Sequence, residues 1–207
     1  MNFFDSFYDQ EYLCGIVTGS HRKGKTLLLA FIAMITHSYY QKVYANFNIN
    51  IPNFEYLDSL DSRTIKKLIP NSLILFTELH HYIDCRKSLD PAQIDLTQSL
   101  QEIGKSGSHF IGDIKLTSML DKRMRDLFTF SIHAFGSRKM YGQQYKDIFK
   151  FGLYHDDLLM FQLNYPEQVF HIYAKDVYGL YDTKEFITGS EIKKEKDLDS
   201  KISNWLS

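Results

Sequence analysis

The chain has 207 residues, with 24 lysines and arginines against 25 aspartates and glutamates, so its formal net charge is −1. This length fits one domain, or one domain with a small appendage, and it excludes both a disulfide-stapled miniprotein and two independent enzymes. Hydrophobic residues make up 44 % and there are only 4 prolines, which excludes a disordered chain. The balanced charge also excludes a strongly basic tail for nucleic acid, although local basic patches can still bind a phosphate backbone.

The cysteines and the uncharged segments indicate an intracellular protein. Cys14 and Cys85 lie far apart among ordinary core residues, which is typical of free thiols in a reducing compartment. Met1–Asp5 lacks the basic start of a signal peptide. The longest uncharged segment, 26–41, contains polar residues and is shorter than the ~20 apolar residues of a membrane-spanning helix, so we expect no transmembrane segment.

Apolar runs and longer helical patterns alternate along the first two thirds of the chain. Short apolar runs predict buried strands, and longer segments that are rich in leucine and alanine, or that carry an apolar stripe at helical spacing, predict helices. Strands separated by helices of this length predict parallel pairing through right-handed crossovers. We expect strands at 12–18, 43–49, 73–76, 109–114 and 128–134, helices at 25–40, 91–104 and 116–127, and one or two short helices within 50–70.

The pattern changes after about residue 138. Apolar runs at 147–154 and 158–163 flank His155-Asp156-Asp157, which predicts a β-hairpin, and 169–173 can add a third strand. We therefore expect an antiparallel addition to the parallel sheet near its C-terminal end.

These elements predict one domain rather than two. We expect an α/β domain over residues 1–190, with a core at about 12–138 and the antiparallel addition at about 139–187. The charge run Glu191–Asp197 has mixed signs, so we interpret 191–207 as a solvated, charged C-terminal tail.

Residues 19–26 form the most specific pattern in the sequence. They match the phosphate-binding pattern G-x-x-x-x-G-K-[ST] in full, and an apolar strand precedes them while a helix follows. Gly19 and Gly24 permit backbone torsions and a close approach that a Cβ would hinder. The loop amides and the helix N-terminus then point at phosphate oxygens. We expect Lys25 to contact the β- and γ-phosphates and the Thr26 hydroxyl to bind Mg²⁺.

This pattern predicts an ATP site with Mg²⁺ as its metal ion. The basic trio at 21–23 has two interpretations, a stronger phosphate site or solvated surface, and both stay open at this point. The expected nucleotide-binding residues are Gly19, Ser20, His21, Arg22, Lys23, Gly24, Lys25 and Thr26.

The apolar run 73–76 ends in an acid. It leads directly into Thr77-Glu78, and a glutamate at this place can activate the attacking water, so we expect Glu78 to be catalytic. P-loop ATPases typically carry Asp-Glu here, so Thr77 stands where the aspartate is expected. A hydroxyl can hold Mg²⁺ through a water but brings no negative charge, which predicts weaker metal binding. The alternative for Glu78 is a surface acid after a core strand, and the adjacent His80 and His81 match no zinc-ligand spacing.

Together with the phosphate loop, further segments resemble the FtsK/HerA superfamily of additional-strand P-loop ATPases. Within it the chain is similar to zonular-occludens-toxin-like ATPases and to viral genome-packaging ATPases, including those of archaeal viruses. The resemblance implies a RecA-like α/β P-loop NTPase fold, with a mostly parallel central sheet flanked by helices and, in this chain, the antiparallel C-terminal extension. The segments that carry it are Asn46-Phe47, Thr77–His80, Asp84–Ser88, Leu120–Asp126 and Tyr181–Glu185.

The resemblance also implies roles for several basic residues. Family members usually carry a glutamine six residues before Asp121, at the end of the fourth core strand, and Lys115 stands there in this chain. A lysine can contact the γ-phosphate, but it cannot accept a hydrogen bond from water as glutamine does. Members assemble as rings, often hexamers, in which an arginine of the neighbouring subunit completes the catalytic site. The candidates are Arg123 and Arg125, then Arg86 and Arg138, and a surface salt bridge is the alternative for each.

The function that the resemblance implies is an ATP-hydrolysing motor that moves double-stranded DNA, above all one that packages a viral genome. Its partners would be DNA, further copies of the chain in a homo-oligomeric ring, and capsid or internal-membrane vertex proteins, in the host cytoplasm or in the virion. The loop-like basic segments 105–108 and 139–146 can face DNA phosphates. One alternative is a nucleotide-binding assembly or adaptor protein with little turnover, which Thr77 and Lys115 motivate. A small-molecule kinase is another, and it predicts an arginine-rich lid that we do not find in the sequence.

Overall fold

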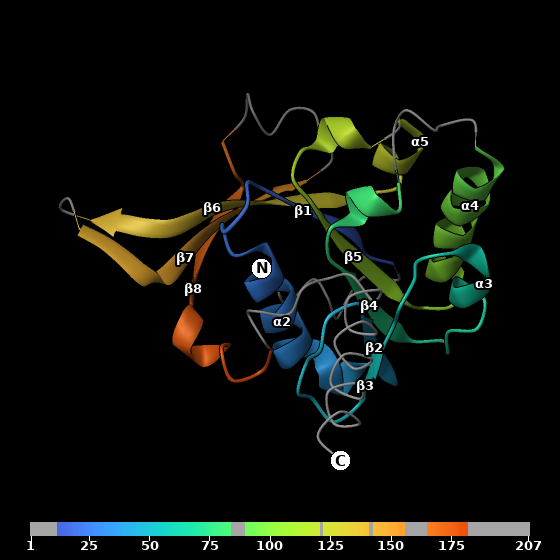
Figure 1. Ribbon diagram of the computed structural model, residues 1–207, viewed down its shortest axis with the longest axis horizontal. Helices are drawn as coiled ribbons and strands as arrows, with labels where there is room; N and C mark the ends of the chain where they lie inside the picture. The colour runs from blue at the N-terminus through green and yellow to red at the C-terminus, as the bar shows by residue number, and fades with distance from the viewer. Residues whose placement is uncertain (1–11, 84–89, 121, 141–142, 156–164, 182–207) are drawn as a thin grey trace, which may run out of the picture.

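The computed structural model describes residues 12–83, 90–120, 122–140, 143–155 and 165–181 (Figure 1). These residues contain an eight-stranded sheet with the strand order β3-β2-β4-β5-β1-β6-β7-β8. The strands are β1 (Cys14–Thr18), β2 (Lys42–Ala45), β3 (Phe54–Tyr56), β4 (Ser72–Phe76), β5 (His109–Ile114), β6 (Phe130–Met140), β7 (Gln143–His155) and β8 (Gln168–Tyr173). The α-helices are α2 (Lys25–Thr36), α3 (Ser62–Ile65), α4 (Pro91–Lys105) and α5 (Lys122–Arg125).

The sheet is parallel from β3 to β6. β1 pairs with β5 on one side and with β6 on the other, β4 lies between β5 and β2, and β3 pairs with β2. Parallel strands need long crossover connections, and α2 and α4 are the helices of two of them. The prediction of an α/β fold with a mostly parallel sheet is therefore confirmed. Because β4 and β5 lie between β1 and β2, the strand that precedes the phosphate loop is central in the sheet.

Alternate residues of the central strands pack into two separate clusters. Val17 of β1 and Leu75 of β4 belong to the cluster that contains the apolar residues of α2. Ile16 and Ile74 belong to the cluster that contains the apolar residues of α4. A strand that is buried on both faces reads as a continuous apolar run, which is why these strands could be recognised.

The last three strands of the sheet are antiparallel. β6 pairs with β7, β7 pairs with β8, and the far ends of β6 and β7 project beyond the rest of the sheet (Figure 1). The run 147–154 lies in β7 and pairs with β6 through Ile132 and Leu153, whereas the predicted partner 158–163 lies outside the described residues. Leu153 of β7 is fully buried in the same apolar cluster as α2. The packing of β7 against the parallel core therefore accounts for its pairing with β6.

Two other segments differ from the predicted helices. Within 50–70 the chain forms β3 before α3, and no residue of β3 is buried, so no apolar run marks this strand. The helix expected at 116–127 is divided into a 3₁₀ helix, Thr117–Met119, and the four residues of α5. As expected, Cys14 is a buried free thiol, while Cys85 lies outside the described residues. No helix in the described ranges is long and apolar enough to cross a membrane.

Candidate nucleotide-binding site

The segment 19–24 connects β1 to α2 at the carboxyl end of the central strand. Gly24 caps α2 with φ 88° and ψ 22°, and Gly19 has φ 140°, so both adopt torsions that favour glycine. Arg22 has φ 60° and is a third position of positive φ in the loop. α2 has 12 residues and no acid in its first turn, so its free N–H groups favour an anion. This geometry suits a loop that surrounds phosphate oxygens.

The phosphate loop rests on the antiparallel extension, a contact that the sequence did not predict. An ideal Cβ on Gly24 would lie 2.5 Å from Cδ1 of Phe149 in β7. One on Gly19 would lie 2.8 Å from the carbonyl oxygen of Ala134 in β6. Glycine is therefore required at both positions for two reasons, the backbone torsions and the close packing against β6 and β7.

The predicted phosphate-binding residues differ in exposure. Ser20, His21, Arg22 and Lys23 are exposed, Thr26 is half-buried, and Lys25 is only 7 % exposed. A buried ammonium group is costly unless it has a partner of opposite charge. Among the described residues, Asp113 on β5 is an acid whose pKa the charge of Lys25 lowers.

Asp113 on β5 is a buried acid that sequence reasoning missed as a site residue. It is 1 % exposed and lies opposite Val17, the penultimate residue of β1. Burial raises the pKa of Asp113 to about 7, whereas the charge of Lys25 and the N–H of Glu78 both lower it. A lone acid inside the predicted apolar strand 109–114 was the signal that could have revealed it.

Hydrogen bonds from both neighbouring strands hold the residues that follow β4. On the β5 side, the N–H of Glu78 donates to Oδ1 of Asp113 at 2.8 Å. On the β2 side, Oδ1 of Asn46 accepts from the N–H and the hydroxyl of Thr77 at 2.8 and 3.1 Å, and its amide donates to the Thr77 carbonyl at 3.0 Å. Glu78 has φ 53° and ψ 46°, a left-handed conformation that costs about 1–3 kcal/mol in a non-glycine residue. The hydrogen bonds thus fix a strained residue in one conformation.

His80 and His81 lie beside Glu78, which their spacing in the sequence does not reveal. Nδ1 of His80 is 3.3 Å from Oε2 of Glu78, and the two imidazole rings have centroids 4.2 Å apart. One ligand atom of each residue lies within 4.8 Å of the other two, so the cluster has the donor types of a transition-metal site. Burial and His81 lower the pKa of His80, although Glu78 raises it, so the neutral ring is favoured beside the carboxylate.

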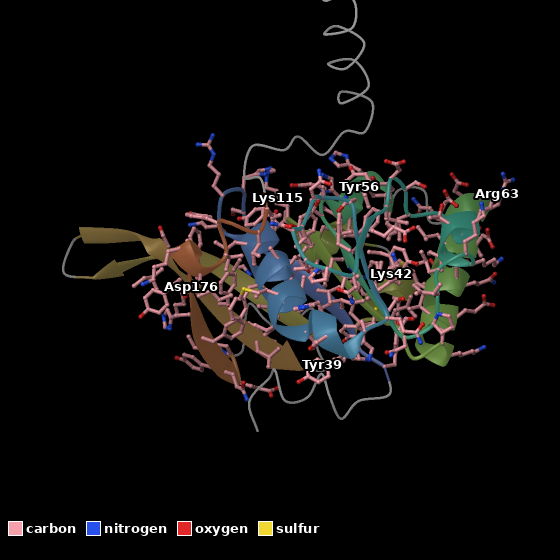
Figure 2. The ribbon with its side chains drawn as sticks, turned by 90° about the horizontal axis from the view of Figure 1, so that it is seen from below. Tyr39, Lys42, Tyr56, Arg63, Lys115 and Asp176 are labelled. Carbon is pink, nitrogen blue, oxygen red and sulfur yellow. The ribbon has the colours of Figure 1, made fainter. Side chains whose placement is uncertain are left out.

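The predicted basic candidates lie in different parts of the chain. Lys115 is exposed, directly follows β5, and lies at the surface of the molecule (Figure 2). The buried polar group at this end of β5 is therefore Asp113, two residues before the expected position. Arg123 is exposed and Arg125 is half-buried, both on α5. Arg86 and the side chain of Arg138 lie outside the part of the chain that is described.

One of the two segments expected to face DNA lies away from the phosphate loop. Residues 105–108 precede β5, and the Ser106 carbonyl accepts a hydrogen bond from Asn71, which precedes β4. This segment therefore lies at the amino ends of the parallel strands, whereas the loop lies at their carboxyl ends. The other segment was expected to be loop-like, but residues 139–140 and 143–146 lie in β6 and β7, and their side chains are not among those described.

No family model matches the chain, and no curated protein sequence matches it either. Solved structures with a similar fold include the N-terminal domain of zonular occludens toxin from Neisseria meningitidis, with a TM-score of 0.60 and 17 % identity, covering 83 % of this chain and 99 % of that chain. They also include the genome packaging NTPase B204 from Sulfolobus turreted icosahedral virus 2 in complex with AMP, with a TM-score of 0.49 and 9 % identity, covering 69 % and 93 %.

The zonular occludens toxin domain belongs to one of the two groups that the sequence resemblance names. At 17 % identity, the likeness to the zonular occludens toxin domain shows the fold alone. The phosphate-loop geometry between β1 and α2 agrees with that fold. The chain therefore has the fold of an α/β P-loop NTPase with a mostly parallel sheet and an antiparallel extension at its C-terminal side.

Proposed function

We propose that the chain is an ATPase that couples hydrolysis to the movement of double-stranded DNA, as the motor that packages a viral genome into its capsid. The observation that supports ATP hydrolysis is the meeting of the phosphate loop, the buried Lys25 and the Glu78–Asp113 pair at one edge of the sheet. These groups match what phosphoryl transfer to water needs: a phosphate cradle, a positive charge and a carboxylate for the water. The DNA and packaging parts of the proposal rest on the sequence resemblance.

The residues present fit Mg²⁺ together with ATP. Mg²⁺ takes oxygen ligands and usually keeps several waters. Thr26 at the start of α2 would bind the ion directly, and Thr77 would hold one of its waters. The Thr77 hydroxyl donates its proton to Asn46 and so keeps lone pairs that can accept from such a water, but the residue is fully buried in the structure. When bound, Mg²⁺ neutralises charge that develops on the β- and γ-phosphates.

The residues of the chain have separate tasks in this proposal. Loop N–H groups and Lys25 bind and orient the phosphates, and the low exposure of Lys25 strengthens its charge interactions. Glu78 orients the attacking water and accepts its proton. Burial lowers the pKa of His80, which favours a neutral ring beside the Glu78 carboxylate.

The assembly in the proposal is a homo-oligomeric ring, with a hexamer as the size that the resemblance favours. Exposed Arg123, or its neighbour Arg125, would reach the γ-phosphate bound by the adjacent subunit. A chain with a net charge of −1 offers few phosphate contacts, and a ring multiplies them. Capsid or internal-membrane vertex proteins would be further partners, in the host cytoplasm or in the virion. Within the site, Lys115 would be a cation near the γ-phosphate.

Two substitutions and two matched controls test the site. Lys25→Ala should lose nucleotide binding and turnover, and Glu78→Gln should keep binding but lose about 10²-fold in turnover, because the amide cannot accept the proton of the water. The controls are Lys42→Ala and Glu55→Gln, since these residues form an ion pair of 3.1 Å on β2 and β3. Both controls should behave like the parent. If Lys25→Ala hydrolysed ATP like the parent, the site assignment would be wrong.

A nucleotide-binding assembly or adaptor protein is the second candidate, and the uncharged Thr77 favours it. ATPase assays with and without double-stranded DNA separate the two functions. Turnover that DNA stimulates supports the motor. Nucleotide binding without turnover, in every oligomeric state, supports the adaptor.

A further inference from the structure

A carboxylate lies level with position 77, but on the neighbouring strand. β5 lies between β1 and β4, and Asp113 is opposite Val17 of β1. On the other side Phe76 pairs with Gly112, so Thr77 and Asp113 follow at the same level. Asp113 is thus placed between the phosphate loop and the end of β4, where the expected aspartate of the Asp-Glu pair is absent.

Asp113 is linked to both functional parts of the candidate site, by a hydrogen bond to Glu78 and by electrostatic attraction to Lys25. Its Oδ1 accepts the N–H of Glu78 at 2.8 Å, and Lys25 is the positive group that acts on its charge. The side chain is 1 % exposed, and a carboxylate buried this deeply is costly unless charge partners and donors surround it. An apolar residue would fill this position of β5 at lower cost, so a task in the site is the economical explanation.

We infer that Asp113 is the acid that position 77 lacks, supplied to the site from β5 instead of β4. This inference rests on the proposed ATPase function. Asp113 is a positioning residue that acts in two ways: it holds the left-handed backbone of Glu78 through the hydrogen bond, and it balances the positive charges of Lys25 and of bound Mg²⁺. Lys25 lowers the pKa of Asp113, and a divalent cation would lower it further, so metal binding favours the ionised carboxylate.

The two tasks can be separated by substitution. Asp113→Asn keeps an oxygen that accepts the Glu78 N–H but removes the charge. The double variants Thr77→Asp/Asp113→Asn and Thr77→Asn/Asp113→Asn have the same shape and differ only in whether a carboxylate returns at 77. The readout is the affinity for a fluorescent ATP analogue, measured with Mg²⁺ and with EDTA, because a merely structural defect would weaken both equally.

We expect Asp113→Asn to lower the gain in affinity from Mg²⁺ by about 10-fold or more, which is the range for a supporting residue of a metal site. The affinity in EDTA should change little. Thr77→Asp in the Asp113→Asn background should restore most of the gain, and Thr77→Asn should restore none. The exposed Asp176→Asn is the matched control and should equal the parent.

The outcomes distinguish this inference from the proposed function. If Lys25→Ala abolishes binding while Asp113→Asn keeps the full Mg²⁺ gain, the inference is overturned and the ATPase stands. If the parent binds no nucleotide, both fail. Should Asp113→Asn not fold, Asp113→Ser decides in its place: it should lower the Mg²⁺ gain by about 10-fold as well, and a full gain in that variant would overturn the inference.

Discussion

At the scale of single residues, the candidate site depends on side chains that hold the backbone rather than touch the nucleotide. Asn46 and Asp113 are both nearly fully buried, and each bonds to the backbone at the end of β4. A buried donor that loses its acceptor costs more than the hydrogen bond itself contributes. The strained conformation of Glu78 therefore persists because both neighbouring strands bind the residues around it.

The first residue-scale prediction concerns pH. Burial raises the pKa of Asp113 from 3.8 to about 7, so the folded state holds this proton more tightly than the unfolded state. Its contribution to the free energy of unfolding is therefore greatest at low pH and is lost as the pH rises from about 4 to 7. Asp113→Asn lacks this pH dependence. When the pH is raised from 5 to 8, its free energy of unfolding, measured by urea titration with EDTA, should therefore rise by more than about 1 kcal/mol relative to that of the parent. An unchanged difference between the two proteins would contradict the assigned environment.

At the scale of elements, the central strands could be predicted because both of their faces are buried. β1 and β4 read as short apolar runs, β5 reads as one interrupted by Asp113, and the pattern at 19–26 identified the loop between β1 and α2. The three half-exposed or exposed residues of β3 carry no such signal. The pairing of β7 with β6 depends on packing against a distant core, which the turn signal at 155–157 does not encode.

The same limit applies to the candidate site. The sequence identified Lys25, Thr77 and Glu78 from local patterns. It could not identify the contact between Glu78 and Asp113, because strand order and register bring these residues together across 35 positions. The placement of His80 against Glu78 is likewise a result of the turn after β4, where the backbone takes positive φ.

The prediction at the element scale concerns the seam between β1 and β6. Gly15 pairs with Phe130, and a Cβ on Gly15 would lie 2.1 Å from Cζ of that buried ring. Gly15→Ala should therefore lower the free energy of unfolding by about 1–3 kcal/mol, measured by urea titration. Phe130→Leu in the same chain should recover part of this loss. The control is Gly179→Ala, where a Cβ meets nothing within 4 Å, and it should stay within about 0.5 kcal/mol of the parent.

At the scale of the whole molecule, the parallel core and the antiparallel extension share one sheet and one apolar cluster. Phe151 of β7 and Ile172 of β8 belong to the same apolar cluster as α2 and Val17 of β1. The extension is thus part of the body that carries the phosphate loop. α5, which carries the arginine candidates, packs through the buried Met124 into the other cluster, with the apolar residues of α4.

The prediction at this scale tests the proposed ring by mixing subunits. Lys25→Ala and Arg123→Ala chains should each be inactive alone, because one lacks its own nucleotide site and the other lacks the arginine that it offers to its neighbour. Mixed oligomers contain intact loops facing intact arginines, so they should regain turnover in an ATPase assay. Mixing Lys25→Ala with Glu78→Gln is the control, since both residues belong to the same subunit's site, and it should regain none. No recovery in mixed oligomers of verified composition would exclude Arg123 from this role.

The contact between Gly24 and Phe149 determines where the chain can be shortened. Phe149 belongs to β7, and β7 pairs with β6. β6 (Phe130–Met140) itself continues past residue 138, where we expected the core to end. A fragment that stopped after the parallel strands would leave Gly24 without the ring that covers it, although every residue of the phosphate-binding pattern would still be present. The smallest unit that preserves the loop in its observed surroundings therefore includes β7, and a chimaera that replaced the C-terminal strands would have to provide an equivalent aromatic ring at position 149.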